Sequence, residues 1–209
     1  MNKTSKVALL FILLVVLSGC ASLLAPKVQQ DVLQLRAGAY ELDTRHTALL
    51  FKVGHLGLST YVGRFNEIKA TLDFDPNNIQ ATKLEAIIEI DSLEINDPDL
   101  AKQLMGKTWF NQKRYPQASF KTLSVAPVTD SQDGSQFDFT GLLSFRGVEK
   151  PLTVRATFNG GANNILNGKY TLGFNATASF LRSDFGMGAF VPLVGDEIQL
   201  EAFAEFLRN

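Results

Sequence analysis

Side chains that carry nucleophilic or metal chemistry are scarce in this sequence of 209 residues. It has one cysteine, Cys20, and two histidines, His46 and His55. A single cysteine permits neither an intramolecular disulfide nor a thiolate metal cluster. The sequence also lacks the Gly-x-Ser-x-Gly turn that presents the nucleophile in many serine hydrolases. We therefore expect a protein that is not an enzyme and has no cofactor.

The two histidines could have roles other than nucleophilic catalysis. A metal site built from His46, His55 and Asp43 is conceivable, but these positions match no established ligand spacing. His46 follows Asp43 in a polar stretch, so we expect it to stabilise a turn. His55 alternates in phase with Phe51 and Val53, which places it on an inward face. There it is either a hydrogen-bonded core residue or a contact for the polar end of a ligand.

The N-terminus has the layout of a secretory signal. Lys3 and Lys6 form a short positive region, Val7–Leu17 is apolar, and small residues follow. The apolar run is shorter than the roughly 20 residues that cross a bilayer as a helix. We therefore interpret residues 1–19 as a signal peptide.

Cys20 directly follows this segment, in the order Leu-Ser-Gly-Cys. This arrangement resembles the bacterial lipobox, in which the cysteine is acylated and becomes the first residue of the mature protein. An ordinary signal peptide with an incidental cysteine is the alternative. The resemblance implies a lipoprotein acylated at Cys20. Because Ala21 rather than aspartate comes next, it also implies the outer membrane, with the domain facing the periplasm.

Composition suits one exported domain. The formal charge of the whole chain is −1 and no basic run is present, so we do not expect nucleic acid as a partner. Sixteen phenylalanines indicate either a large aromatic core or an apolar cavity. Residues 20–37 have no strong strand pattern, and we assign them to a linker that carries the lipid anchor. The folded domain is then expected over residues 38–209.

Alternation of apolar and polar residues dominates this domain and predicts half-buried strands. It is regular in six segments: 48–55, 84–90, 137–145, 152–158, 170–180 and 198–206. It is less regular in 61–74 and 118–125. In the first of these two, the apolar phase changes near Asn66-Glu67, where a bulge would restore a single inward face.

One short helix interrupts the strands. Asp97 suits an N-cap, Pro98 the first helical position and Gly106 a stop, and Leu100 and Leu104 share one face. We expect this helix to cover one mouth or one side of the strands. About eight antiparallel strands with short turns and one helix predict an all-β, up-and-down β-barrel.

The polar face of the strands decides between two kinds of barrel. A membrane-spanning barrel would turn its apolar face outward. The polar positions here are rich in Glu, Thr, Arg and Asn, so we expect them to face water and the phenylalanines to face inward. Small inward residues such as Gly141, Ala156 and Ala176 alternate with the rings, which suits either a tunnel or a tapered packed core. The polar stretch from Arg182 to Gly188, which includes Asp184, is either a structural turn with an ion pair or a mouth for ligand.

Several short stretches, in this order and at this spacing, resemble the YceI family. They are Tyr40–Asp43 with His46-Thr47, Phe51–Ser59, Gly63–Phe65, Trp109-Phe110, Tyr115-Pro116, Phe120–Thr122, Gly141–Leu143, Arg146–Val148, Arg182–Met187 and Gly195–Glu197. The resemblance implies a lipocalin-like antiparallel barrel. It also implies binding of a long polyisoprenoid or related amphiphile, such as an isoprenoid quinone or its precursor, in an apolar tunnel.

The resemblance therefore favours a membrane-anchored periplasmic protein that holds or carries such a lipid. The alternative is a non-catalytic structural or interaction lipoprotein with a filled barrel. The expected partners are an isoprenoid lipid and, through the acyl anchor, a membrane; a homodimer is left open. The residues expected to contact the lipid are Phe51, Val53, His55, Phe65, Phe120, Phe139, Phe145, Phe174 and Phe180.

Overall fold

The computed structural model describes the chain from residue 27 onward, over residues 27–129, 131, 134–165 and 167–209. The predicted signal peptide, residues 1–19, and the predicted acylation site Cys20 lie outside these residues. Both therefore stay predictions.

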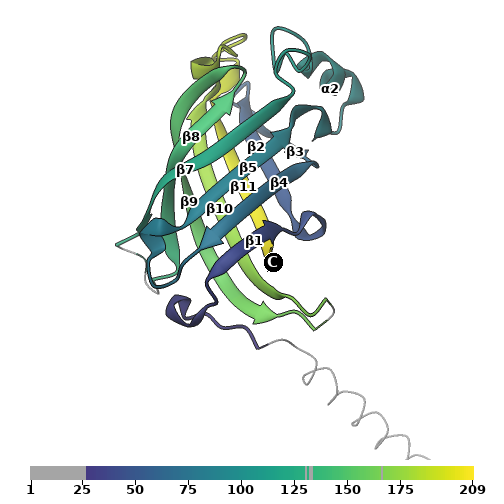
Figure 1. The fold of residues 1–209 in the computed structure, drawn as a ribbon. Coiled ribbons are helices and arrows are strands. Elements are labelled where there is room, and N and C mark those ends of the chain that lie inside the picture. The colour runs from purple at the N-terminus through teal and green to yellow at the C-terminus, as the bar shows by residue number, and fades with distance from the viewer. Residues whose placement is uncertain (1–26, 130, 132–133, 166) are drawn as a thin grey trace, which may run out of the picture.

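The described residues form one antiparallel sheet that closes on itself (Figure 1). Its strands are β1 Gly38–Leu42, β2 Ala48–His55, β3 Ser59–Phe65, β4 Ile68–Phe74, β5 Lys83–Glu89, β6 Leu93–Glu94, β7 Gln117–Pro127, β8 Gln136–Phe145, β9 Val148–Asn163, β10 Tyr170–Leu181 and β11 Val194–Arg208.

The order around the barrel is β1-β4-β5-β7-β8-β9-β10-β11, and β11 pairs back onto β1 with Tyr40 opposite Arg208. The strands β2, β3 and β6 extend β1, β4 and β5 toward one end, since β2 also pairs with β11 and β3 pairs with both β2 and β6. The wall therefore has eight positions, each occupied by one strand or by two consecutive ones. The prediction of an up-and-down barrel of about eight strands is confirmed.

The two irregular sequence segments correspond to irregular strands. The break expected near Asn66-Glu67 separates β3 from β4, and Phe65 and Ile68 on its two sides both face the interior. Strand β7 has a register shift between Thr122 and Ser124. This shift interrupts the alternation and explains why the pattern over residues 118–125 is weak.

The predicted helix is α2, Pro98–Leu104. The Asp97 carboxylate accepts hydrogen bonds from the amides of Asp99 and Leu100, both at 3.0 Å, so Asp97 is the N-cap. Short 3-10 turns lie at η1 Val32–Gln34, η2 Thr44–His46, η3 Ile79–Ala81, η4 Ile90–Ser92 and η5 Arg182–Phe185. Within the described part of the chain, no helix is long and apolar enough to cross a membrane.

The barrel has two different ends. The mouth end carries the turn between β2 and β3, the segment 95–116 with α2, and the segment 182–193 with η5. The closed end carries β1, the C-terminus and residues 27–37 (Figure 1).

Residues 28–36, part of the predicted linker, pack against the closed end. Gln29 and Gly161 exchange two backbone hydrogen bonds of 2.8 and 2.9 Å, and Leu35 is buried. Gly160 admits this segment, because a Cβ there would lie 2.2 Å from the Val28 side chain. This part of the linker is therefore a component of the barrel.

Candidate functional site

Two adjoining apolar cavities occupy the interior of the barrel. The larger, about 310 Å³, lies at the mouth end, and the smaller, about 180 Å³, lies deeper, toward the closed end. Both are lined by Leu49, Ile88, Leu143 and Leu200. They are therefore neighbouring compartments that share part of one wall.

Small side chains keep the deeper cavity open. Ala176 on β10 lies opposite Ala156 on β9 and Ala202 on β11, so three inward alanines form a row across three strands. In the next inward row, Phe174 pairs with Phe158 and Ala204. The alternation of large and small inward residues thus leaves space that a uniformly large set would fill.

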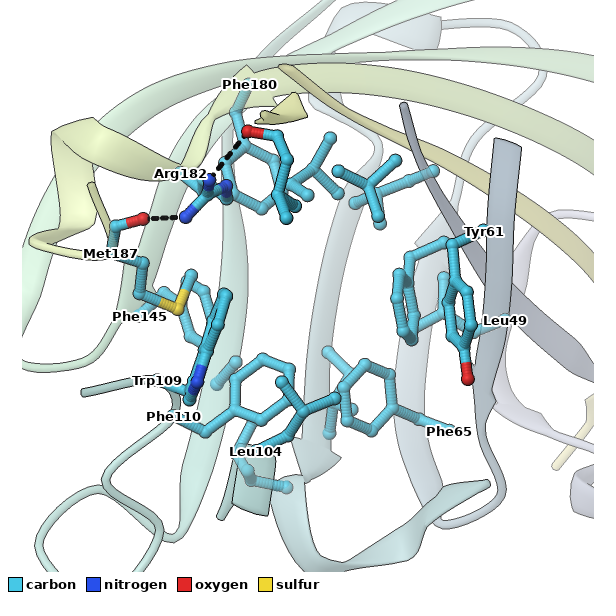
Figure 2. A pocket seen from close by; sticks show the side chains of 18 of the residues that line it. Leu49, Tyr61, Phe65, Leu104, Trp109, Phe110, Phe145, Phe180, Arg182 and Met187 are labelled. Atoms are coloured by element: carbon cyan, nitrogen blue, oxygen red, sulfur yellow. Dashed lines mark hydrogen bonds between the residues drawn. The ribbon is translucent and has the colours of Figure 1, made fainter. Parts of the chain in front are cut away.

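Aromatic rings form a continuous belt around the mouth cavity (Figure 2). Ring centroids are 5.8 Å apart for Phe51 and Phe65 and 6.0 Å apart for Phe65 and Phe110. The belt continues from Phe110 to Phe145 at 6.0 Å and from Phe145 to Phe180 at 6.1 Å. Rings at these separations form favourable aromatic pairs and present an apolar surface to the cavity.

All nine residues expected to contact a lipid line one of the two cavities. Phe51, Val53, His55, Phe65, Phe145 and Phe180 line the mouth cavity, and Phe120, Phe139 and Phe174 line the deeper one. Their contact with a ligand stays a prediction.

His55 is not the buried core residue that one of its two expected roles required. It is the last residue of β2, pairs with Ser59 and Val194, and is exposed at the rim of the mouth cavity. Alternation gives the face of a strand to which a residue belongs but not its depth in the barrel. The remaining role, a contact for the polar end of a ligand, fits this position.

The lining of the mouth cavity also includes residues that sequence reasoning did not select. Leu100 and Leu104 of α2 and the adjacent Trp109 and Phe110 cover one side of it. In the sequence, the leucine pair at i, i+4 followed by two aromatic residues predicted a helix that covers one mouth or one side of the barrel. It did not show that these side chains line a cavity. Tyr61 also lines the cavity, as do Arg182 and Met187 from the stretch that sequence reasoning considered as a mouth.

Arg182 is a buried cation at the edge of the mouth cavity (Figure 2). Only 2% of its surface is exposed, and its guanidinium lies 5.5 Å from the centre of the Trp109 ring. The sequence signal for Arg182 was its phase: it is the first residue of η5, directly after β10, and lies two positions beyond the inward Phe180. The guanidinium donates to four backbone oxygens, those of Gly195 at 2.8 Å, Ala189 and Val194 at 2.9 Å each, and Met187.

The electrostatics of Arg182 are unusual, because backbone dipoles rather than a carboxylate satisfy its charge. Burial lowers the pKa of Arg182, and the charge of Asp196 partly opposes this effect. The Asp196 carboxylate itself bonds to the Ser183 amide at 2.9 Å and hydroxyl at 2.6 Å. The stretch is a structural turn that also forms one wall of the mouth, so the two roles coincide. The expected ion pair does not form between Arg182 and Asp184, whose carboxylate lies 3.9 Å from the Lys150 ammonium.

Tyr61 contributes a second polar group to the lining. Its hydroxyl is buried and has no hydrogen-bond partner among the described residues. A buried polar group without a partner costs about 1–3 kcal/mol. A ligand that bonds to this hydroxyl would recover part of that free energy.

His46 stabilises a turn, as expected, and the proposed grouping with His55 does not form. Its Nδ1 atom lies 3.0 Å from the Asp43 carboxylate, whose other oxygen accepts the Arg45 amide at 3.0 Å. These bonds lower the pKa of Asp43, the His46 bond most strongly. Glu205 brings a third possible metal ligand within 4.8 Å, whereas His55 lies at the far end of β2. The turn itself accounts for the contact between Asp43 and His46.

Comparison with known proteins agrees with this geometry. The family model of the YceI-like domain matches residues 40–206. A UPF0312 protein of Shewanella denitrificans is 33% identical over 191 residues, which are 90% of this chain and 94% of that protein.

Solved structures share the fold. The crystal structure of BcnA from Burkholderia cenocepacia matches with a TM-score of 0.70 at 24% identity, over 78% of this chain and 98% of that one. A polyisoprenoid-binding domain from Saccharophagus degradans matches with a TM-score of 0.62 at 10% identity, over 83% and 100%. With the family match spanning most of the barrel, the chain belongs to the family of proteins with a YceI-like domain.

Proposed function

We propose that this protein binds a long apolar lipid of the polyisoprenoid type inside the barrel, with the tail in the two cavities and the polar end at the mouth. The observation that carries this proposal is the pair of adjoining apolar cavities, which share four lining residues. A chain-like ligand fits two compartments in series better than a compact one.

The energetics favour a ligand that is mostly hydrocarbon. Burial of apolar surface contributes about 25 cal/mol per Å² before ordering costs. An isoprenoid tail offers much such surface, and the ring belt and alanine rows accept it without polar partners. The polyisoprenoid-binding domain of Saccharophagus degradans supports the choice of ligand class through its shared fold.

The polar end of the ligand would lie among the few polar groups of the mouth. The Tyr61 hydroxyl has no partner within the described protein and could donate to a carbonyl or similar oxygen. His55 is exposed at the rim. A quinone or a quinone precursor has a head group of this kind, with a few hydrogen-bond acceptors on a large apolar body.

We also propose the location. Residues 1–19 as a signal peptide and Cys20 as an acylated residue would tether the barrel to the outer membrane, with the domain in the periplasm. The support is the order Leu-Ser-Gly-Cys after an apolar run. Metabolic labelling with palmitate tests it, since label should enter the wild-type protein and not Cys20→Ser. The alternative is a structural lipoprotein with a filled barrel, and such a protein would not need the two cavities.

The ligand can be identified from the protein itself. Residues 21–209, purified without detergent and extracted with organic solvent, should release a long-chain isoprenoid detectable by mass spectrometry. Ala176→Phe places a ring in the deeper cavity and should reduce the recovered lipid at least tenfold. Ser179→Phe, exposed on the outer face of the same strand, is the matched control and should leave it unchanged.

Two results would contradict this proposal. An empty wild-type extract, together with no rise in melting temperature on adding isoprenoid quinone, would reject lipid binding. Equal recovery from Ala176→Phe and wild type would place the ligand outside the deeper cavity.

A further inference from the structure

Large apolar side chains gather in solvent around the mouth. Leu58 is 84% exposed and Phe190 59%, and Leu56, Val191 and Leu193 are exposed beside them. We term these five residues the apolar rim. They come from two segments joined by a 2.7 Å hydrogen bond between the Leu56 amide and the Leu193 carbonyl. A contiguous apolar surface of this kind marks an interaction site more often than scattered single residues do.

The backbone holds part of the rim in an unfavourable conformation. Leu56 and Phe190 have positive φ angles of 54° and 62°, a region that large side chains rarely adopt. Both residues lie inside turns closed by backbone hydrogen bonds, from the Leu58 amide to the His55 carbonyl at 3.0 Å and from the Val191 amide to the Gly188 carbonyl at 3.4 Å. These turns require the positive φ angles but not large apolar side chains, and neither side chain is buried. The fold itself therefore does not account for a leucine and a phenylalanine at these exposed positions.

A group of cations adjoins the rim. The mouth segment 95–116 carries Lys102, Lys107, Lys113 and Arg114 against two acids, Asp97 and Asp99. All four cations are exposed, and none forms an ion pair with a carboxylate among the described residues. The segment meets the rim where Trp109 stacks on Phe190, with ring centroids 6.0 Å apart.

We propose that the apolar rim and these four cations form a membrane-contact surface that seats the mouth on an anionic phospholipid bilayer. Apolar side chains at the tip can enter the acyl boundary while flanking lysines and arginines bind anionic head groups. A second copy of this chain fits less well, because rim-to-rim contact would bring the two sets of cations together. Such a contact would let a lipid pass directly between the bilayer and the cavity. This role, unlike the contact itself, rests on the proposed function.

The contact is separate from the predicted acyl anchor. Residues 28–36 lie at the closed end, where Gln29 pairs with Gly161, whereas the rim lies at the mouth end (Figure 1). A tether that enters at the closed end does not by itself present the mouth to a membrane. The rim can therefore be tested in protein that lacks Cys20.

Co-sedimentation with vesicles tests the proposal. Residues 21–209 are mixed with vesicles of phosphatidylcholine alone or with about one third phosphatidylglycerol. We expect binding to the anionic vesicles that weakens with salt. Leu58→Glu with Leu193→Glu should reduce it at least tenfold, and Lys107→Glu with Lys113→Glu at least threefold. Leu123→Glu, an exposed leucine on β7, is the matched control and should bind as wild type does.

The single tryptophan gives a second readout, since Trp109 lies against the rim. Its emission should shift to shorter wavelength on anionic vesicles. No wild-type binding, or binding that the rim variants leave unchanged, would overturn the proposal. So would a dimer in sedimentation velocity that the rim variants abolish, since the rim would then bind a second copy.

Lipid recovery from the same proteins separates this proposal from the proposed function. If the barrel releases its isoprenoid on extraction but fails to bind vesicles, the contact surface is rejected and lipid binding stands. If it binds vesicles through the rim but yields no lipid and is not stabilised by added isoprenoid, the contact surface stands and lipid binding is rejected.

Discussion

The two ends of the barrel are built from the same alternating strands, yet side chains pack across the centre of one end, whereas the other encloses an apolar cavity. At the closed end Tyr40 and Leu172 are 1% and 0% exposed, and Leu35 packs inward from the N-terminal segment. At the mouth end, inward residues such as Ile198 and Leu104 remain partly exposed to a cavity. Alternation therefore creates an apolar interior, and the segment that covers each end decides whether space remains.

The two covers are held by different interactions. At the closed end the Tyr40 hydroxyl donates to the Arg36 carbonyl, and the Arg36 guanidinium lies 4.5 Å from the centre of the Tyr170 ring. At the mouth end Arg146 donates to the carbonyls of Phe185 at 2.9 Å and Lys107 at 2.8 Å, joining two loops. The closed end is held by Leu35 and by the contacts of Arg36 with two tyrosines, whereas the mouth is a set of loops joined by hydrogen bonds from arginines to backbone oxygens.

The largest difference should appear when one leucine is truncated at each end. Leu172→Ala removes a fully buried side chain and should lower the free energy of unfolding by about 3–5 kcal/mol. Leu104→Ala, whose side chain borders an existing cavity, should cost about 1 kcal/mol. Urea unfolding of both variants measures the difference. Equal losses would mean that the mouth is as tightly packed as the closed end.

Arg182 tests whether the mouth loops depend on one cation. Arg182→Met should leave several backbone oxygens without donors and cost about 2–3 kcal/mol. Amide hydrogen exchange should accelerate over residues 186–195, while residues 161–163 of β9 and 170–173 of β10, at the closed end, stay protected.

Arg182→Lys is the matched control for this substitution. It keeps the charge but lacks the planar fork, so it should fall between methionine and wild type. Uniform acceleration of exchange around the barrel would show that the two ends are not independent.

Sequence predicted the wall of the barrel better than its covers. Period-two alternation identifies inward faces because each buried residue repeats the same local geometry, and the phase change at Asn66-Glu67 reported a real break. Helix α2 was predictable because Asp97 and Pro98 act within a few residues. Sequence placed Arg182 in a polar stretch that was either a turn or a mouth for ligand, but did not show which groups it bonds to. Its acceptors are backbone oxygens, which every residue carries, so no residue type reports them.

The closed end was missed for a related reason. Residues 28–36 show no alternation, since a single bridge at Gln29 and one buried leucine, Leu35, dock them. Such docking depends on Gly160 leaving space for Val28, a contact between positions far apart in sequence. His55 was placed on the correct face but at the wrong depth, because depth depends on where a neighbouring strand ends.

Alkaline pH should act on the closed end through Tyr40. Burial raises the pKa of Tyr40 from 10.0 to about 12. Between these two pH values the folded state holds a proton that the unfolded state releases. The contribution of Tyr40 to the free energy of unfolding is therefore fully present below pH 10 and is lost as the pH rises toward 12. The loss is about 2–3 kcal/mol, from a shift of about two pKa units. Tyr40→Phe should be slightly less stable at neutral pH and should show a smaller fall, because burial also raises the pKa of Tyr170. Denaturant unfolding at several pH values can follow the difference.

The smallest effect should come from Asp43, on the wall between the two ends. The His46 bond, followed by the Arg45 amide, lowers the pKa of Asp43. Its contribution to stability is therefore present above the unfolded pKa, near 4, and is lost as the pH falls through the lower folded value. Asp43→Asn should lower the free energy of unfolding by about 1 kcal/mol at pH 7, typical of a turn cap, and the difference from wild type should shrink on acidification.

Hydrogen exchange at both ends of the barrel should stay unchanged in Asp43→Asn at pH 7, because the turn contacts neither Arg182 nor residues 28–36. A loss of protection at the mouth in this variant would mean that β1 and β2 transmit strain along the wall, and the two ends would then have to be treated as one cooperative unit.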